Sequence, residues 1–143
     1  DNQSMSVKGV LRGLHFQKNF PQTKLVRAIK GSVFDVAVDL RTGSATYGKW
    51  YGVELTEENH RQLFVPRGFA HGFAVLSEEA VFQYKCDDFY APQCEGAIAW
   101  DDPDLGIEWG IPMEDVILSE KDKVHPRLKD AAELFDYSTD YYI

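Results

Sequence analysis

Two histidines in strand-like segments are the first residues that could do chemistry. His15 lies in the segment 11–17 (LRGLHFQ), and His71 lies near the end of the segment 65–72 (VPRGFAHG). Histidine changes its charge near neutral pH, so it is the usual choice for a base that must accept a proton there. Apolar neighbours are equally typical of a histidine that only fills a core, and both interpretations stay open for each residue.

A small group of cations accompanies these histidines. Strand alternation places His15 and Gln17 on one face, and Lys24 opens the next apolar segment, where a buried ammonium is costly unless it is paired or used. Arg12, Lys24 and Arg67 lie close to the histidines in a chain with 15 Lys and Arg against 23 Asp and Glu. A local cationic cluster on an acidic protein favours an anionic ligand, although such side chains more often only reach solvent.

Tyr84 and Asp122 are weaker candidates when each is considered by itself. Alternation in the segment 80–86 (AVFQYKC) places Tyr84 on an apolar face, which is typical of a core tyrosine. Its hydroxyl would still need a partner if buried, and it could donate a proton. Asp122, in the segment 118–122 (LSEKD), has the setting of a solvated surface charge.

Short strands must position these residues. The segment 33–40 (VFDVAVDL) alternates apolar residues with Asp35 and Asp39, which predicts a half-buried strand. Helical periodicity appears only in residues 127–135 (RLKDAAELF), which predict a short docked helix. Turn residues separate the strand-like runs, so we expect a β-sandwich or barrel. The other predicted strands are 8–17, 24–30, 48–55, 61–65, 71–76, 80–86 and 96–100.

Length and composition bound the class of protein. A chain of 143 residues with 44% hydrophobic residues predicts one domain, 1–143, with one core. Its net charge of −8 disfavours nucleic acid and membrane surfaces as partners, and no apolar run is long enough to cross a bilayer. Cys86 and Cys94 lack the spacing of a metal site and the density of a disulfide scaffold, so we expect reduced thiols and a cytoplasmic location.

Several spaced motifs together resemble the dTDP-4-dehydrorhamnose 3,5-epimerase family of the cupin superfamily. The likeness runs from Asn2 to about Pro126 in the expected order. It implies an all-β, cupin-type jelly roll of antiparallel strands, to which the short C-terminal helix would be added. It also implies a homodimer, no cofactor, and an N-terminal strand segment that the family places before Asn2 and that is missing here. The matching segments are 9–17 (GVLRGLHFQ), 31–41 (GSVFDVAVDLR), 65–73 (VPRGFAHGF), 89–92 (FYAP), 100–103 (WDDP) and 118–122 (LSEKD).

The resemblance implies an isomerase that acts on a nucleotide sugar. The substrate would be dTDP-4-keto-6-deoxy-D-glucose and the product dTDP-4-keto-L-rhamnose, the 4-keto precursor of dTDP-L-rhamnose. Inversion at C3 and C5 would remove a proton beside the C4 ketone and return one on the opposite face. A mono-epimerase acting on a related nucleotide sugar and a non-catalytic sugar-nucleotide-binding cupin stay open as alternatives.

The matching motifs also imply a role for each site residue. His15 would be the catalytic base, Asp122 the carboxylate that pairs with it, and Tyr84 the proton donor on the other face of the sugar. Lys24 would stabilise the enolate oxygen. The implied substrate-binding residues are Arg12 and Lys121 near the diphosphate, His71 near the sugar, Tyr90 near the thymidine, and Asn2, Ser4 and Gln17 in the same site.

The wider cupin pattern bears on whether a metal is used. Metal-binding cupins supply a His-x-His pair and a downstream Glu, whereas this chain has His15 followed by Gln17, and Lys24 at the glutamate position. An ammonium group has no lone pair and repels a divalent cation. The sequence therefore predicts acid–base chemistry without a metal and opposes a metal-dependent cupin oxygenase or isomerase.

Arg12 and His15 would point to opposite faces of a regular strand, although both are expected at the ligand. Either Gly13 marks a β-bulge that re-aims Arg12, or Arg12 reaches the ligand from another direction. The local geometry of the segment 11–17 decides between these two possibilities.

Overall fold

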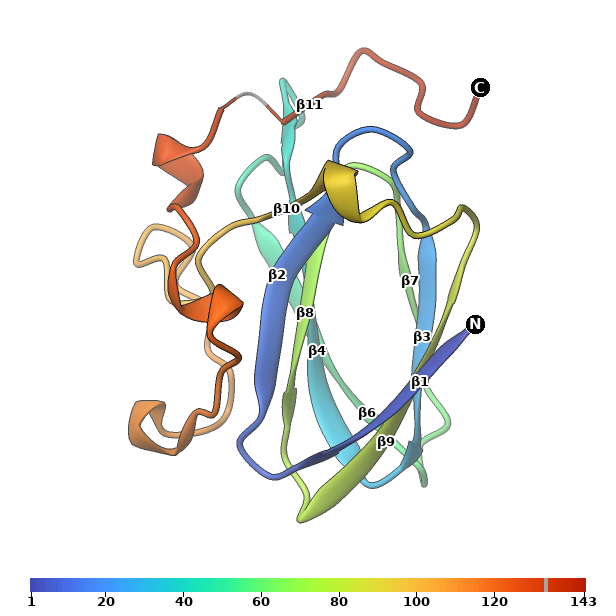
Figure 1. Cartoon of the computed structure of the whole chain (residues 1–143), viewed down its shortest axis with the longest axis vertical. Helices are drawn as coiled ribbons and strands as arrows, with labels where there is room; N and C mark the ends of the chain where they lie inside the picture. The colour runs from blue at the N-terminus through green and yellow to red at the C-terminus, as the bar shows by residue number, and fades with distance from the viewer. Residues whose placement is uncertain (133) are drawn as a thin grey trace.

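Two antiparallel β-sheets face each other in the computed structural model, which describes residues 1–132 and 134–143 (Figure 1). One sheet has the order β1-β9-β3-β7 and the other β10-β2-β8-β4-β6. A short parallel pair, β5 and β11, lies beside them. The strands are β1 (Asn2–Val7), β2 (Leu11–Gln17), β3 (Lys24–Lys30), β4 (Ser32–Asp39), β5 (Arg41–Thr42), β6 (Trp50–Thr56), β7 (Leu63–Val65), β8 (Phe69–Val75), β9 (Glu79–Cys86), β10 (Glu95–Ala97) and β11 (Phe135–Asp136).

The predicted all-β jelly roll is confirmed, because every predicted strand segment overlaps an observed strand. The strand β1 was not predicted. It lies at the edge of its sheet, paired only with β9, and its sequence NQSMSV is largely polar. An edge strand with polar residues on one face shows little hydrophobic alternation, so periodicity alone does not detect it.

The strand β4 is buried on both faces, which corrects the predicted half-buried strand. Phe34 and Val36 pack into a core that lies between the five-stranded sheet and the segments after β10. Val33, on the opposite face, packs between the two sheets. Asp35 and Asp39 share that opposite face and are fully buried. Hydrogen bonds with His71 and Arg41 offset part of the cost of burying these carboxylates, although among the described residues the Asp35 Oδ2 has no hydrogen-bond partner.

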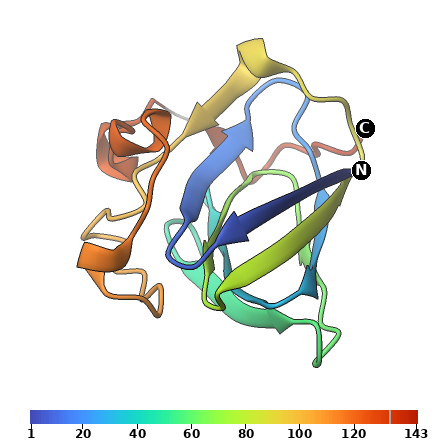
Figure 2. The same ribbon diagram turned by 60° about the horizontal axis from the view of Figure 1, so that its bottom comes forward.

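Segments from the C-terminal third cover the outside of the five-stranded sheet (Figures 1 and 2). They are mainly extended, with 3-10 turns η1 (Pro92–Cys94), η2 (Met113–Asp115), η3 (Lys121–Lys123) and η4 (Leu128–Asp130). This cover explains why both faces of the sheet are apolar. No helix in the described part of the chain is long and apolar enough to span a membrane.

The segment 127–135 is not the docked helix that its periodicity predicts. It holds only the single turn η4, after which the chain is extended again and enters β11; position 133 lies outside the described residues. The carboxylate of Asp102 accepts the Leu128 N–H at 2.8 Å, and β11 pairs with β5. Leu128 and Phe135 still reach the core. Apolar residues with the spacing expected of a helix therefore contact the core without forming one.

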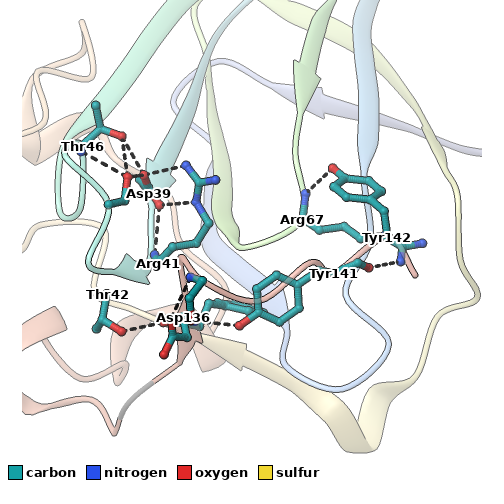
Figure 3. A network of polar contacts seen from close by, with 11 residues as sticks. Asp39, Arg41, Thr42, Thr46, Arg67, Asp136, Tyr141 and Tyr142 are labelled. Carbon is teal, nitrogen blue, oxygen red and sulfur yellow. Dashed lines mark hydrogen bonds and ion pairs between the residues drawn. The ribbon is translucent and has the colours of Figure 1, made fainter.

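Buried Asp39 anchors the turn after β4 (Figure 3). Its two oxygens accept hydrogen bonds from the Arg41 guanidinium, both at 2.9 Å, and from the hydroxyls of Ser44 and Thr46, both at 2.7 Å. Burial alone would raise the pKa of Asp39, but these donors lower it to about 2. The ionised carboxylate is therefore the stable form in the folded protein.

The C-terminal arm, residues 135–143, is tied to the loops above the sheets (Figure 3). The Arg67 guanidinium donates to the Tyr141 carbonyl at 2.6 Å, and the Tyr142 hydroxyl accepts the Arg67 N–H at 3.0 Å. The Thr23 hydroxyl also donates to Tyr142, at 3.1 Å. The arm thereby holds the β7–β8 turn against the start of β3.

We expect Asp39→Asn to lower the free energy of unfolding by about 2 kcal/mol at pH 7. The pKa of Asp39 is about 2 in the folded state and 3.8 in the reference state, so its contribution is complete above about pH 4 and is lost as the pH falls toward 2. Urea unfolding at pH 7 and at pH 3.5 should show the deficit shrinking at the lower pH. Asp101→Asn, at an exposed position, serves as the control; an equal deficit at both pH values would contradict the assignment.

Candidate active site

A cavity of about 650 Å³ lies between the two sheets, within the size range of small-molecule sites. Strands β1, β3 and β9 form one wall, β2 and β8 form the other, and the segment 86–90 and η3 contribute to its rim. The structure brings every predicted site residue to this cavity. These residues are Asn2, Ser4, Arg12, His15, Gln17, Lys24, His71, Tyr84, Tyr90, Lys121 and Asp122.

A β-bulge in β2 directs both Arg12 and His15 into the cavity. Arg12 pairs with Phe73 and His15 pairs with His71, so three steps along β2 match two steps along β8. The extra residue reverses the alternation, which settles the question in favour of the bulge at Gly13. Gly13 has φ 132°, and a Cβ there would lie 2.7 Å from the Cα of Gly72. Only glycine fits this close approach of the two strands.

His15 and Asp122 form a direct contact at the cavity wall. The His15 Nε2 lies 2.6 Å from the Asp122 Oδ1, although 107 residues separate them in the sequence. Burial alone would raise the pKa of Asp122, but hydrogen bonds from His15, His125 and the Gly13 N–H hold it well below its usual range. An ionised carboxylate only accepts hydrogen bonds, so in the neutral imidazole of His15 the Nε2 carries the hydrogen and Nδ1 has the lone pair.

His125 is a member of this cluster that the sequence analysis missed. Its Nε2 lies 2.8 Å from the same Asp122 Oδ1. It follows Asp122 by three residues, and that short spacing was the one available signal. His15, Asp122 and His125 each offer one atom that could bind a metal ion, and these three atoms lie within 4.8 Å of one another. Hydrogen bonding of both imidazoles to one carboxylate oxygen already accounts for this closeness.

A second histidine–carboxylate pair lies in the wall formed by β8 and β4. The His71 Nε2 lies 2.8 Å from the Asp35 Oδ1, and both residues are buried. Burial raises the pKa of Asp35, an effect that His71 and Lys24 only partly offset. The His71 ring stacks on Phe82, with centroids 6.1 Å apart. Asp35 was predicted as the polar side of a strand, and its role as the partner of His71 was not foreseen.

Lys24 and Tyr84 come from the sheet opposite His15. The Lys24 ammonium lies 5.5 Å from the centre of the Tyr84 ring. Burial lowers the pKa of Lys24, while the charges of Cys86 and Asp35 oppose that shift. Burial also raises the pKa of Tyr84, so its hydroxyl keeps its proton at neutral pH. The cavity thus has a potential base on one wall and a potential acid on the other.

Glu95 connects two predicted substrate-binding residues at the cavity rim. Lys121 donates to one of its carboxylate oxygens at 3.1 Å, and the Tyr90 hydroxyl donates to the other at 2.7 Å. Burial alone would raise the pKa of Glu95, but these donors hold it below its ordinary value. Glu95 was not predicted, because nothing in its local sequence indicates these partners.

Gln17 lines the cavity, and its side-chain amide is hydrogen-bonded to the backbone around it. Its amide nitrogen donates to the carbonyls of Phe20 at 2.8 Å and Phe89 at 3.2 Å, and its oxygen accepts the Ala91 N–H at 2.8 Å. Both amide hydrogens are therefore used by the backbone. Gln17 thereby fixes the loop that carries Tyr90, and its predicted contact with the ligand stays a prediction.

The fold and the site together define a jelly-roll protein equipped for acid–base chemistry on a small molecule. Comparisons with known proteins identify the family. The family model for dTDP-4-dehydrorhamnose 3,5-epimerase matches residues 1–130. An enzyme of that name from Methanothermobacter thermautotrophicus is 60% identical over 124 residues, which are 86% of this chain and 67% of that protein.

Two further relatives agree with this match. A dTDP-4-dehydrorhamnose 3,5-epimerase from Pseudomonas aeruginosa is 57% identical over 132 residues, which are 92% of this chain and 72% of that protein. A dTDP-6-deoxy-D-glucose-3,5-epimerase from Legionella pneumophila, solved in complex with dTDP-4-keto-L-rhamnose, superposes with a TM-score of 0.93 at 51% identity, covering 96% of this chain and 74% of that one. The chain belongs to the dTDP-4-dehydrorhamnose 3,5-epimerase family.

We expect Gly13→Ala to lower the free energy of unfolding by about 2–4 kcal/mol, because the new Cβ meets the backbone of Gly72 and the backbone conformation disfavours a side chain. Urea unfolding measures the change. Gly43→Ala is the matched control, since Gly43 has φ 86° but a Cβ there meets its nearest atom at 3.8 Å; its cost should be only about 1–2 kcal/mol. Equal costs for the two variants would show that the close approach is unimportant.

Proposed function

We propose that this protein is an epimerase that inverts C3 and C5 of dTDP-4-keto-6-deoxy-D-glucose to give dTDP-4-keto-L-rhamnose, a step toward dTDP-L-rhamnose. The observation that carries the proposal is the 2.6 Å contact between His15 and Asp122 at the wall of the cavity. Membership of the epimerase family and the similarity to the Legionella enzyme solved with dTDP-4-keto-L-rhamnose support it.

His15 is the proposed base. Its Nδ1 carries the lone pair when Nε2 donates to Asp122, so Nδ1 accepts the proton from C3 or C5. The buried, ionised Asp122 stabilises the imidazolium that forms and fixes the orientation of the ring. Both carbons flank the same ketone, so one base serves both inversions in turn.

Lys24 is the proposed stabiliser of the enolate. When the C–H bond breaks, its electron pair becomes part of a C–C double bond and the negative charge moves to the C4 oxygen. A buried ammonium beside that oxygen interacts strongly with the developing charge because little water screens it. His71, held by Asp35, is proposed to bind the sugar from the neighbouring wall.

Tyr84 is the proposed acid. It lies on β9, whereas His15 lies on β2 of the facing sheet, so a sugar ring between them has the base on one face and the phenol on the other. Transfer of the phenol proton to the enolate carbon, on the face opposite the base, completes the inversion. The phenolate then regains a proton from solvent and the His15 imidazolium releases one to solvent, which resets both groups for the second inversion.

The rim residues are proposed to bind the nucleotide. Arg12 and Lys121 supply positive charge for the diphosphate, the Tyr90 ring stacks on the thymine, and Asn2 and Ser4 line the wall beside the sugar. Because Lys121 pairs with Glu95 at 3.1 Å, the diphosphate must compete with Glu95 for this ammonium. We propose that the site works as one domain without a resident metal or other cofactor.

We also propose a cytoplasmic homodimer. Cys86 and Cys94 are free thiols, which suits a reducing compartment. The outer face of the sheet β1-β9-β3-β7 carries exposed apolar side chains, a pattern that indicates an interface. A second copy of the chain is the occupant that the family resemblance implies. The apolar residues of this face are Met5, Val7, Leu25, Ile29 and Phe64.

The function is tested by incubating the 4-keto sugar nucleotide with the protein in D₂O and following C3 and C5 by NMR. We expect deuterium at both carbons. Deuterium at one carbon would indicate a mono-epimerase, and deuterium at neither carbon would indicate a binding protein.

His15→Ala should reduce exchange at both carbons by about 10²–10⁴-fold, whereas His60→Asn, at an exposed histidine, should not. Tyr84→Phe should impair net inversion more than exchange, and unchanged turnover would disprove its role as the acid.

The dimer is tested by sedimentation equilibrium. The wild-type protein should have twice the monomer mass of 16.3 kDa, and a double variant, Met5→Lys with Ile29→Lys, should sediment as a monomer because two charges would be buried unpaired. Tyr51→Lys, at a residue equally exposed on β6 of the other sheet, is the control. A dimer that survives both substitutions would place the interface elsewhere.

A further inference from the structure

Arg67 belongs to the cationic cluster predicted from the sequence but, unlike Arg12 and Lys24, it does not line the cavity. It lies on the β7–β8 turn, and its side chain contacts the C-terminal arm (Figure 3) and Asp87. We propose that Arg67 is a positioning residue that joins the arm to the rim segment, residues 86–90, and thereby raises the affinity of the site for its nucleotide. The inference rests on the proposed function in that this rim binds the nucleotide.

The guanidinium of Arg67 connects two parts of the chain that are far apart in the sequence. Its Nη1 donates to the Tyr141 carbonyl at 2.6 Å, and its Nη2 lies 3.2 Å from the Asp87 Oδ2. Its Cζ also lies 5.0 Å from the centre of the Tyr142 ring. The side chains of Arg67 and Asp87 are only 17% and 38% exposed, so solvent screens this ion pair less than a fully exposed one.

Thr23 completes the network between the arm and the rim segment. Its N–H donates to the Asp87 Oδ1 at 2.7 Å, and its hydroxyl donates to the Tyr142 hydroxyl at 3.1 Å. The Arg67 N–H donates to the same Tyr142 oxygen at 3.0 Å. Both carboxylate oxygens of Asp87 are therefore held, each by a residue that the arm also contacts.

The rim segment is held at both ends, and only the anchor at Asp87 depends on the arm. At the other end, Gln17 donates to the Phe89 carbonyl at 3.2 Å and accepts the Ala91 N–H at 2.8 Å. Tyr90 is 66% exposed, so its position depends on how the backbone of the segment is held. A segment that is already ordered loses less entropy when a ligand binds, so both anchors favour binding.

Arg67→Gln removes the ion pair and should loosen the rim segment. In the free protein, hydrogen–deuterium exchange of the backbone amides of residues 86–90 should become faster, while that of β4 stays unchanged. The dissociation constant for dTDP, measured by calorimetry, and the KM should both rise about 3- to 10-fold, with kcat nearly unchanged. Arg61→Gln, which loses the same charge at an exposed position, is the matched control and should change none of these quantities.

Asp87→Asn separates positioning from simple charge. The diphosphate is an anion, so loss of a negative charge at the rim would strengthen dTDP binding if charge alone mattered. Positioning requires the opposite result, because the neutral amide no longer attracts the guanidinium of Arg67 and the segment loses its anchor. In the double variant the two losses should not add, since both substitutions remove the same contact.

Tyr142→Phe is a milder variant that keeps the ring beside the guanidinium and removes the hydroxyl that accepts from Arg67 and Thr23. It should change amide exchange and dTDP binding in the same direction as Arg67→Gln, by a smaller factor. The inference is overturned if Arg67→Gln leaves the amide exchange of the rim segment or the dTDP affinity unchanged, or if Asp87→Asn strengthens dTDP binding. Weaker dTDP binding by these variants in a protein that places no deuterium in the sugar would instead disprove the proposed function and leave the role of Arg67 intact.

Discussion

The buried carboxylate of Asp122 is the group on which the rest of the site depends. A buried ionised carboxylate is stable only when donors surround it, and here the donors are Gly13 and His15 on the bulged strand β2, and His125, two residues after η3. The segment outside the five-stranded sheet is therefore tied to the sheet at the point where the chemistry is proposed to occur. Docking of η3 and orientation of His15 are two results of one set of hydrogen bonds.

The two facing sheets divide the interior into an apolar part and a polar part. Phe73 and Phe82, whose rings stack with centroids 4.3 Å apart, belong to the core between the sheets and also line the cavity. They form the boundary at which close packing ends and space for a ligand begins. The glycine pair Gly13 and Gly72 lets β2 approach β8 beside this boundary, so the packing that stabilises the sheets also sets the direction of His15.

Local sequence patterns predicted the strands but not the partners of polar residues. Alternation located β4, whereas the burial of Asp35 depends on His71, which is 36 residues away. The motif resemblance brought His15 together with Asp122, yet His125 and Glu95 were missed because their contacts arise from tertiary structure. Helical periodicity in residues 127–135 predicted a helix that does not form, although Leu128 and Phe135 of this segment do reach the core. Edge strand β1 has too few apolar residues to be recognised without its partner β9.

The burial of Lys24 links the electrostatics of the cavity to the proposed reaction. Burial lowers the pKa of this ammonium, which means that its charged form is poorly stabilised before the reaction begins. An enolate oxygen that forms beside it supplies the missing negative charge, so the attraction is greater in the transition state than with the neutral ketone. Only such differential stabilisation raises the rate of the chemical step. A fully solvated lysine would already be stabilised by water and would gain less from the same anion, which is the physical reason for placing this cation inside the cavity.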